Sequence, residues 1–318
     1  SPSPAEEETM RMKFFVAALS IAAFATYANL AAARQHTAKA GSFGTSITRV
    51  LERTTSGDVI FVEAGVYDQV YETFPLQMKA GIALVGASAE NTVISAGDVN
   101  AIEGDSAGVV IDNLTIASNA QTIFLQSASA PAGLSIRNSI IRGGTNPGGL
   151  ALIVRNNDTR VTIENSDLSA YDGLGISGSS STSTLDVEIT GTSITSNAPP
   201  LAAEAAIGVG RANSVTLNKV TVRNFFENFQ IHGVNEISVD DLNGVSNVNS
   251  GATKVLIRNS LLGYIDGNEE PAGLDQRSNG TMKIVDTMLA NGAEAPANHG
   301  DITLLNCYDQ HLNPVTMP

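Results

Sequence analysis

The chain has 318 residues, of which 42% are hydrophobic, 16% charged and 5% aromatic. This composition argues against disorder and supplies enough apolar residues for a large core. The formal net charge of −14 argues against a basic nucleic-acid-binding face, so no nucleic-acid partner is expected.

The N-terminal segment has the pattern of a secretory signal peptide. Arg11 and Lys13 precede the apolar residues 14–25, and Ala31-Ala32-Ala33 forms an A-x-A cleavage site before Arg34. Residues 1–33 are therefore interpreted as upstream residues plus a signal peptide. The apolar run is too short for a stable membrane span, so the mature chain is expected to have none. The predicted location is secreted, periplasmic or at the cell surface.

A short phrase recurs along the rest of the chain at intervals of 18 to 28 residues. It consists of alternating apolar and polar residues and ends on Asn, Asp, Gly or Lys. Alternation gives each copy one apolar face, and the terminal residue suits a bend in the backbone. The copies begin at Val109, Leu134, Val161, Val187, Val215, Ile237, Val255, Met282 and Ile302.

A second set of phrases lies between these copies and keeps step with them. Each has apolar residues two positions apart, and the set begins at Ile123, Leu152, Leu174, Ile207, Phe229 and, more weakly, Leu274. Two strand phrases in step, with no 3.6-residue periodicity, exclude βαβ units and an antiparallel sandwich. A leucine-rich repeat is excluded by its different consensus. The pattern predicts an all-β, right-handed, single-stranded parallel β-helix of about eleven coils.

The start of the solenoid is predicted to be capped by a short helix. Residues 45–54 place Ile47, Val50 and Leu51 on one helical face, which would cover the open end of the core. Residues 34–57 are therefore assigned to an N-terminal cap, and residues 58–318 to the β-helix, with its first strand at residues 59–63.

The N-terminal region also resembles a known fold family. The segments that carry the likeness are Gly44-Thr45, Leu51, Gly57–Val62, Gly65–Tyr67, Glu72–Leu76 and Gly81–Gly86. Their order resembles the opening of bacterial pectate-lyase-like proteins, specifically a β-helix family of uncharacterised function. The resemblance implies the fold and export. It leaves the function open, because lyases, glycosidases, phage spikes and surface proteins share this fold.

The resemblance implies that an enzyme of this fold would carry catalytic motifs such as N-T-D, G-H-G and R-I-K. The chain contains none of these three. Asp240-Asp241 occurs, but Asp241 fills the last place of a repeat phrase and is interpreted as a turn. The second set of phrases offers a stacked row of polar residues instead. Arg155, His232 and Arg277 are the catalytic candidates of this row, and Arg155, Asp275 and Arg277 are the candidates for binding a ligand. Gly175, Gly208 and Gly210 beside them would leave a shallow trough.

Metal and thiol chemistry find little support in the sequence. Four His and one Cys occur in no zinc-like spacing, so no metal site and no cofactor are predicted. The acidic loop from Asp266 to Glu270 has oxygen ligands that suit Ca²⁺, but it lacks EF-hand spacing and is interpreted as a solvated turn. Cys307 is expected to be a buried, inert side chain.

The sequence thus favours a secreted or cell-envelope β-helix with a structural or surface-interaction role and a polysaccharide or envelope glycan as partner. The absence of Trp weakens the prediction of a polysaccharide partner, since sugar-binding sites often stack aromatic rings against the sugar. The alternative is a polysaccharide lyase or glycoside hydrolase that acts on an acidic polysaccharide through Arg155, His232 and Arg277.

Overall fold

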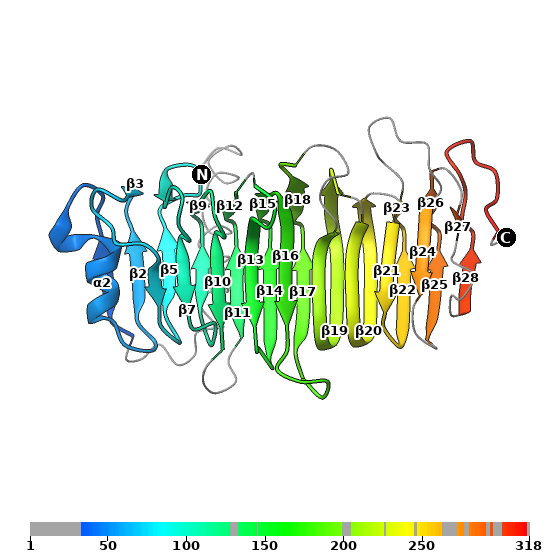
Figure 1. Ribbon diagram of the computed structural model, residues 1–318, viewed down its shortest axis with the longest axis horizontal. Coiled ribbons are helices and arrows are strands. Elements are labelled where there is room, and N and C mark those ends of the chain that lie inside the picture. Colours follow the sequence, from blue (N-terminus) through cyan, green and yellow to red (C-terminus); the bar gives the residue numbers. More distant parts are fainter. Residues whose placement is uncertain are drawn as a thin grey trace, which may run out of the picture.

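The computed structural model describes residues 33–127, 133–144, 146–198, 205–225, 227–244, 247–262, 272–276, 280–290, 293–294 and 301–316. These residues form a right-handed parallel β-helix, a rod with one helix at its N-terminal end (Figure 1). Residues 1–32, which hold all but the last residue of the predicted signal peptide, and the loop from Asp266 to Glu270 lie outside the described residues. No helix in the described ranges is long and apolar enough to cross a bilayer.

The strands stack in three columns, each paired in parallel with the strand one turn away. The main repeat phrase forms column 1. Column 1 consists of β1 (Gln35–Ala38), β2 (Val59–Val62), β5 (Ala83–Gly86), β8 (Val110–Asp112), β11 (Leu134–Arg137), β14 (Arg160–Glu164), β17 (Asp186–Thr190), residues 214–218 of β19 (Ala205–Arg223), residues 236–240 of β20 (Glu227–Gly244), β22 (Lys254–Arg258), β25 (Thr281–Val285) and β28 (Asp301–Leu305).

The other two columns complete each turn, and the second set of phrases forms column 3. Column 2 consists of β3 (Gly65–Asp68), β6 (Thr92–Ser95), β9 (Thr115–Ala117), β12 (Ile140–Arg142), β15 (Asp167–Ala170), β18 (Ser193–Ser196), residues 221–223 of β19, residues 242–244 of β20, β23 (Leu261–Leu262) and β26 (Met288–Leu289). Column 3 consists of β4 (Leu76–Met78), β7 (Ile102–Gly104), β10 (Ile123–Gln126), β13 (Leu150–Arg155), β16 (Asp172–Ser177), residues 205–210 of β19, residues 227–232 of β20, β21 (Asn247–Gly251), β24 (Ala272–Gln276) and β27 (Ala293–Glu294).

About nine turns are fully formed, slightly fewer than the eleven expected. The difference lies at the ends of the rod. β1 precedes the first complete turn, and two of the three strands in the β25–β26–β27 turn have only two residues. Within the described residues, no further strand of columns 2 or 3 follows β28. The sequence pattern counts phrases, whereas a complete turn requires all three strands.

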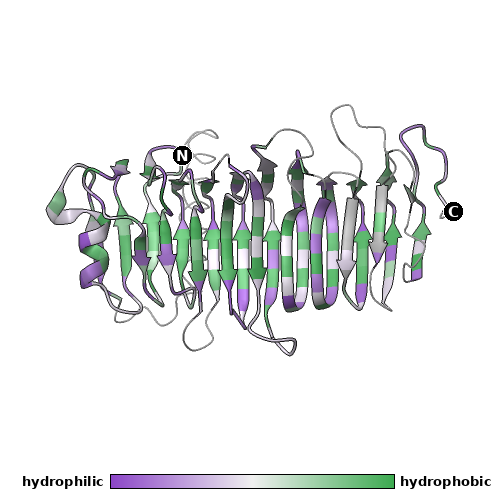
Figure 2. Cartoon of the chain, in the orientation of Figure 1, coloured by the Kyte–Doolittle hydropathy of each residue, from purple (hydrophilic) through white to green (hydrophobic). Residues whose placement is uncertain are grey.

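The core is a set of aliphatic ladders inside the rod. In the ten strands of column 1 from β2 to β25, the inward position pairs with the same position one turn away, and all of these side chains are at most 1% exposed. This ladder comprises Ile60, Leu84, Ile111, Ile136, Ile163, Ile189, Leu217, Val239, Ile257 and Ile284. Hydrophobic and polar residues alternate along the strands, as strand geometry requires (Figure 2).

The bend after each column 1 strand is built from residues in the left-handed region. All nine positions from residue 113 onward have φ between 47° and 62°. They are Asn113, Asn138, Asn165, Gly191, Lys219, Asp241, Asn259, Asp286 and Asn306. Asn and Gly adopt this conformation at low cost, which explains their recurrence. The predicted bend at the last place of the repeat phrase is confirmed, and Asp241 takes its left-handed conformation within β20.

The N-terminal end carries α2 (Ile47–Arg53), which a 3₁₀ helix, η3 (Phe43–Thr45), precedes. Ile47, Val50 and Leu51 are buried against the first turn, so the predicted capping face is confirmed. The segment before the helix differs from expectation, because it contains β1, which pairs with β2. β1 has the sequence QHTA, whose single buried residue is Ala38, and so it gives no apolar alternation from which a strand could be predicted.

Cys307 is buried at 3% exposure, as expected. Its thiol lies 3.5 Å from the carbonyl oxygens of Ile284 and Leu305. Burial raises the pKa of the thiol, so the reactive thiolate is disfavoured. The residue therefore has a packing role at the C-terminal end of the core.

Candidate functional site

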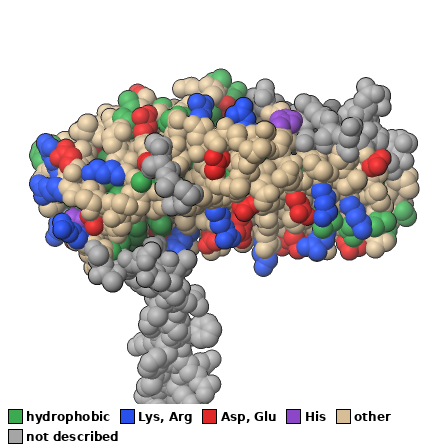
Figure 3. Space-filling view, turned by 90° about the horizontal axis from the view of Figure 1, so that it is seen from below, with side chains coloured by type: hydrophobic (Ala, Val, Ile, Leu, Met, Phe, Trp, Pro, Cys, Tyr) green, Lys and Arg blue, Asp and Glu red, His purple; other side chains and the backbone are tan. Residues whose placement is uncertain are grey.

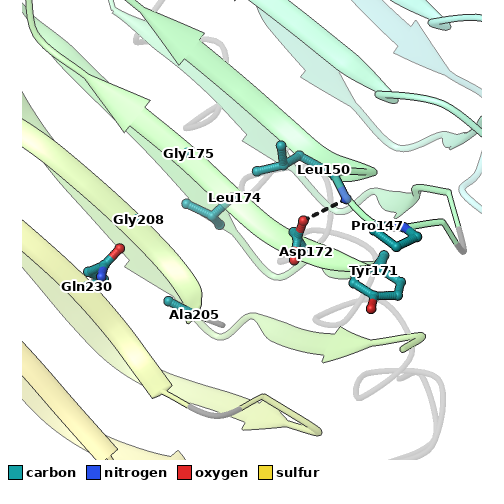
Figure 4. Close-up of a pocket in the computed structure, with 10 residues that line it drawn as sticks. Pro147, Leu150, Tyr171, Asp172, Leu174, Gly175, Ala205, Gly208 and Gln230 are labelled. Carbon is teal, nitrogen blue, oxygen red and sulfur yellow. Dashed lines mark hydrogen bonds between the residues drawn. The ribbon is translucent and has the colours of Figure 1, made fainter. Parts of the chain in front are cut away.

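A trough of about 470 Å³ lies on the outer face of column 3, near the middle of the rod. It crosses β13, β16, β19 and β20, which lie side by side in parallel register. The residues that line it are Pro147, Gly148, Leu150, Tyr171, Asp172, Leu174, Gly175, Ala205, Gly208 and Gln230 (Figure 4).

The floor of the trough is a pair of glycines on neighbouring strands. Gly175 of β16 pairs with Gly208 of β19, and Gly208 pairs with Gln230 of β20. Strand alternation directs these three positions outward, because their neighbours Leu174 and Ile207 are buried. The missing side chains of the two glycines leave the hollow that Gln230 borders.

Neither floor glycine is required by the fold. A Cβ at Gly175 would meet only Leu150 Cδ2 at 3.8 Å, and a Cβ at Gly208 would meet the Leu174 carbonyl oxygen at 3.4 Å. Both are ordinary contact distances, and neither residue has a positive φ. Gly173, in contrast, is required for packing, because its Cβ would lie 1.9 Å from the Ala206 carbonyl oxygen. The floor glycines thus keep a surface open where a larger side chain would fit.

One wall of the trough is a fixed carboxylate. The Gly148 amide donates a hydrogen bond of 3.0 Å to Asp172 Oδ2, and the Asp172 amide donates one of 3.1 Å to the Gly149 carbonyl. The loop that carries Gly148 is thereby attached to the start of β16. Because the backbone amide and the carboxylate of Asp172 both form hydrogen bonds, the carboxylate has a defined position at the trough (Figure 4).

Tyr171 lies at the same end of the trough as Asp172, and Gln230 lies at the opposite end (Figure 4). The Tyr171 ring is partly buried against the core, and its backbone amide donates a 2.8 Å hydrogen bond to the Gly144 carbonyl. The lining therefore combines a ring and apolar surface with one carboxylate, one amide and one phenol hydroxyl. Such a surface suits a ligand that presents C–H groups and hydroxyls.

The ten lining residues contain no Lys, Arg or His and only one carboxylate. An anionic ligand would find no cation among them. Hydrolysis of a glycosidic bond by the usual mechanism needs two carboxyl groups on opposite sides of the bond. Among the described residues, the trough thus offers hydrogen-bonding and apolar groups, and neither a cation nor a pair of carboxyl groups.

The predicted site residues form part of a neighbouring row, not of the trough itself. Arg155 ends β13, and its guanidinium carbon lies 5.4 Å from the centre of the Phe124 ring, over β10. His232 is exposed on β20 and pairs with Gly210 of β19. Three turns of about 4.8 Å separate the strands of Arg155 and His232, or about 14 Å, so the two side chains do not form one catalytic cluster.

The other two predicted residues lie at the margin of what is described. Asp275 lies in β24, and its backbone pairs with that of Asn249. Its side chain is not among those that the structure describes. Arg277 lies outside the described residues. Within the described part of the chain, no group of three His, Cys, Asp or Glu side chains could hold a metal ion.

The residues that sequence reasoning missed are Asp172, Tyr171 and Gln230. The outward glycines of the second set of phrases are the signal in the sequence that predicts the trough. Asp172 precedes the second-set phrase by two residues, so the alternation of that phrase did not include it. The position of the Asp172 carboxylate depends on the loop that carries Gly148, and a repeat pattern in the sequence does not predict where that loop lies.

A second hollow of about 470 Å³ lies on the outer face of column 1, between Gly108 and Glu164. Its two cations are already paired: Arg137 Nε lies 3.0 Å from Asp112 Oδ2, and Arg160 pairs with Glu188. Acidic and basic side chains alternate along one long edge of the rod (Figure 3). Ion pairs between neighbouring turns leave this hollow less suited to a ligand than the trough on column 3.

Several solved structures resemble this one, but their sequences are only 11–14% identical to this chain. The catalytic unit of the thermostable GH87 α-1,3-glucanase from Streptomyces thermodiastaticus strain HF3-3 is 12% identical, with a TM-score of 0.44, over 86% of this chain and 68% of that one. The pectin methylesterase from Aspergillus niger is 11% identical, with a TM-score of 0.33, over 88% of this chain and 85% of that one. The A-module of the mannuronan C-5 epimerase AlgE4 from Azotobacter vinelandii is 14% identical, with a TM-score of 0.28, over 82% of this chain and 91% of that one.

These similarities are too low to carry an activity to this chain, and its fold rests on the strand pairing described above. No curated protein matches the sequence. A family model does match, over residues 36–261, which extend from β1 to β23. The chain therefore belongs to the family described as "Protein of unknown function (DUF1565)", and it folds as a right-handed parallel β-helix.

Proposed function

We propose that this protein is an exported glycan-binding β-helix of the cell envelope or its surroundings, and that it binds a neutral, hydroxyl-rich polysaccharide in the trough on column 3. The observation that carries the proposal is the glycine floor. Gly175 and Gly208 lie outward on neighbouring strands, although the backbone and the packing would accept a side chain at both.

The chemistry of the walls supports a sugar ligand. Asp172 accepts hydrogen bonds from hydroxyls, and the amide of Gln230 both donates and accepts. Leu150, Pro147 and the ring of Tyr171 supply apolar surface for the C–H face of a sugar. The export signal predicted from the N-terminal sequence would bring the protein to where such polymers occur.

The test is a binding assay with the variant Gly208→Val. A valine fills the floor of the trough, so affinity for the polysaccharide should fall at least about tenfold. The thermal midpoint should stay the same or rise, because Val is preferred over Gly in strands. The matched control is Thr216→Val, which changes an outward residue of the same strand on column 1 and should leave binding intact.

The assay uses a panel of neutral glucans, mannans and xylans beside pectate and alginate, measured by affinity electrophoresis and titration calorimetry. Wild-type affinity in Gly208→Val would refute the trough as the binding site. Retention of the wild-type protein by the uronate polymers alone would refute a neutral ligand.

The lyase or hydrolase alternative is tested with the same panel. A lyase would release unsaturated products with ultraviolet absorbance, and a hydrolase would release reducing ends. Turnover that Arg155→Ala or His232→Ala abolishes would replace the binding proposal by an enzymatic one. The distance between these two residues leads us to expect no such turnover.

A further inference from the structure

The hydrogen bonds that join β1 to β2 begin next to the predicted export cleavage site. The Arg34 carbonyl accepts a 2.9 Å hydrogen bond from the Val59 amide, and the pairing of β1 with β2 continues from Gln35. The predicted signal peptide ends at Ala33. A pattern in the sequence and the start of the strand ladder therefore indicate the same bond independently.

The amide nitrogen at this position donates to a buried carboxylate. Arg34 N lies 3.2 Å from Asp58 Oδ1. The Asp58 side chain is 4% exposed and is otherwise bound through Oδ2, which accepts a 2.9 Å hydrogen bond from the Thr55 amide and lies 3.1 Å from His36 Nε2. A buried carboxylate is costly unless a positive charge or several donors compensate it.

We propose that export creates a charged anchor at this position: after cleavage between Ala33 and Arg34, the new α-ammonium group of Arg34 pairs with Asp58 and fixes β1 to the first turn. An export peptidase hydrolyses the peptide bond with one water molecule. The carbonyl carbon of Ala33 takes the hydroxyl and becomes a carboxylate, and the Arg34 nitrogen takes protons and becomes the ammonium. The neutral N–H donor is thereby replaced by a charged donor at the same place.

The consequence is a solenoid whose N-terminal turn is more strongly stabilised in the exported form than in the uncleaved chain. Charge-assisted hydrogen bonds are stronger than those of a neutral amide, above all to a desolvated partner. Asp58 lies in the turn between α2 and β2, so the pair connects the start of β1 to the segment that follows the capping helix. The inference rests on the predicted signal peptide, as does export in the glycan proposal, but it is independent of the glycan-binding site, because the trough lies on turns that do not include Asp58.

The test displaces the ammonium group without changing any other part of the chain. Two residues, Ser-Gln, are inserted between Ala33 and Arg34 in the full chain, the protein is exported by a bacterial host, and N-terminal sequencing identifies the first residue of each product. The wild-type product should begin at Arg34. A different first residue in that product would overturn the proposal.

The thermal midpoint is then compared in three backgrounds. We expect the insertion to lower the midpoint by about 2–4 °C in the wild type, the shift that one such interaction produces in a domain of this size. In Asp58→Asn the insertion should have no effect. In Asp68→Asn, which changes a partly buried carboxylate at the same end of the rod that does not contact Arg34, the insertion should lower the midpoint as in the wild type.

Equal shifts in the wild type and in Asp58→Asn, or no shift in the wild type, would overturn the anchor. Because Asp58→Asn could prevent folding, hydrogen exchange of the Val59 amide gives a second measurement on the wild type and the insertion alone. This amide bonds to the Arg34 carbonyl and should exchange faster when the ammonium is displaced. Unchanged exchange would also overturn the proposal.

Discussion

Tyr67 illustrates how a single buried polar residue makes stability depend on pH. It is 1% exposed in β3, and its hydroxyl oxygen lies 3.0 Å from the carbonyl oxygens of both Ala38 and Glu63, which share its one proton. Burial, with smaller contributions from the carboxylates of Glu63 and Glu72, raises the pKa of Tyr67 to about 12. The folded protein therefore prefers the neutral phenol well above the pH at which an unfolded tyrosine ionises.

We predict a loss of stability in alkali that is specific to Tyr67. The stabilisation is fully present below about pH 10, where the unfolded tyrosine is neutral, and is lost as the pH rises towards about 12. The fall should be about 2 kcal/mol in the free energy of unfolding, measured with urea at pH 9 and pH 11.5. Tyr67→Phe should remove this fall, while Tyr71→Phe should retain it. An equal fall in wild type and Tyr67→Phe would contradict the assignment.

At the scale of elements, the bends between columns 1 and 2 decide how the chain turns. The bend residues share one conformation, but one of them, Lys219 in β19, is neither Asn, Asp nor Gly. Its φ of 53° is costly for a residue whose side chain makes no local bond to the backbone. Among the nine bends, this one therefore has the residue that least favours the left-handed conformation.

Lys219→Asn is predicted to stabilise the protein by about 1 kcal/mol, because Asn tolerates the left-handed region better than Lys. The free energy of urea unfolding measures the gain. Lys283→Asn, a change of the same type at an exposed position within β25, is the control and should not stabilise. Equal or lower stability of Lys219→Asn relative to wild type would show that the backbone cost is small at this bend.

At the scale of the whole molecule, the two ends of the rod differ. α2 covers the N-terminal end with three buried side chains, and Glu72 fixes its first turn by accepting hydrogen bonds from the Ile47 and Thr48 amides at 2.8 and 2.7 Å. At the other end, β28 pairs with β25, but its inward side chains are only half-buried, and Leu305 is 41% exposed. Each turn of a solenoid is stabilised mainly by its neighbours.

Unfolding is therefore predicted to begin at β28. Hydrogen exchange followed by mass spectrometry should show the amides of β28 exchanging at least tenfold faster than those of β14 and β17, which have a neighbouring strand on both sides. Equal protection of β28 and β14 would contradict this order. Peptides that contain β2, next to the capped end, should resemble β14 more than β28.

The periodic sequence predicted most of the fold. Alternation of apolar residues identified the strands of columns 1 and 3, and the recurring Asn113, Asn138 and Asn165 identified the bend, because both signals are local properties of the chain. β1 was missed for the same reason: QHTA has no apolar alternation and becomes a strand through its backbone pairing with β2.

The candidate site was predicted only in part. The sequence by itself determined that Gly175 and Gly208 lie outward in one row, since alternation fixes which face each residue takes. Only the tertiary structure decided that Asp172, Tyr171 and Gln230 border these glycines and that Gly148 holds the carboxylate in place. The trough joins residues from 147 to 230 through strand register and through a loop between columns, and neither the path of a loop nor the direction of its side chains follows from a repeat period.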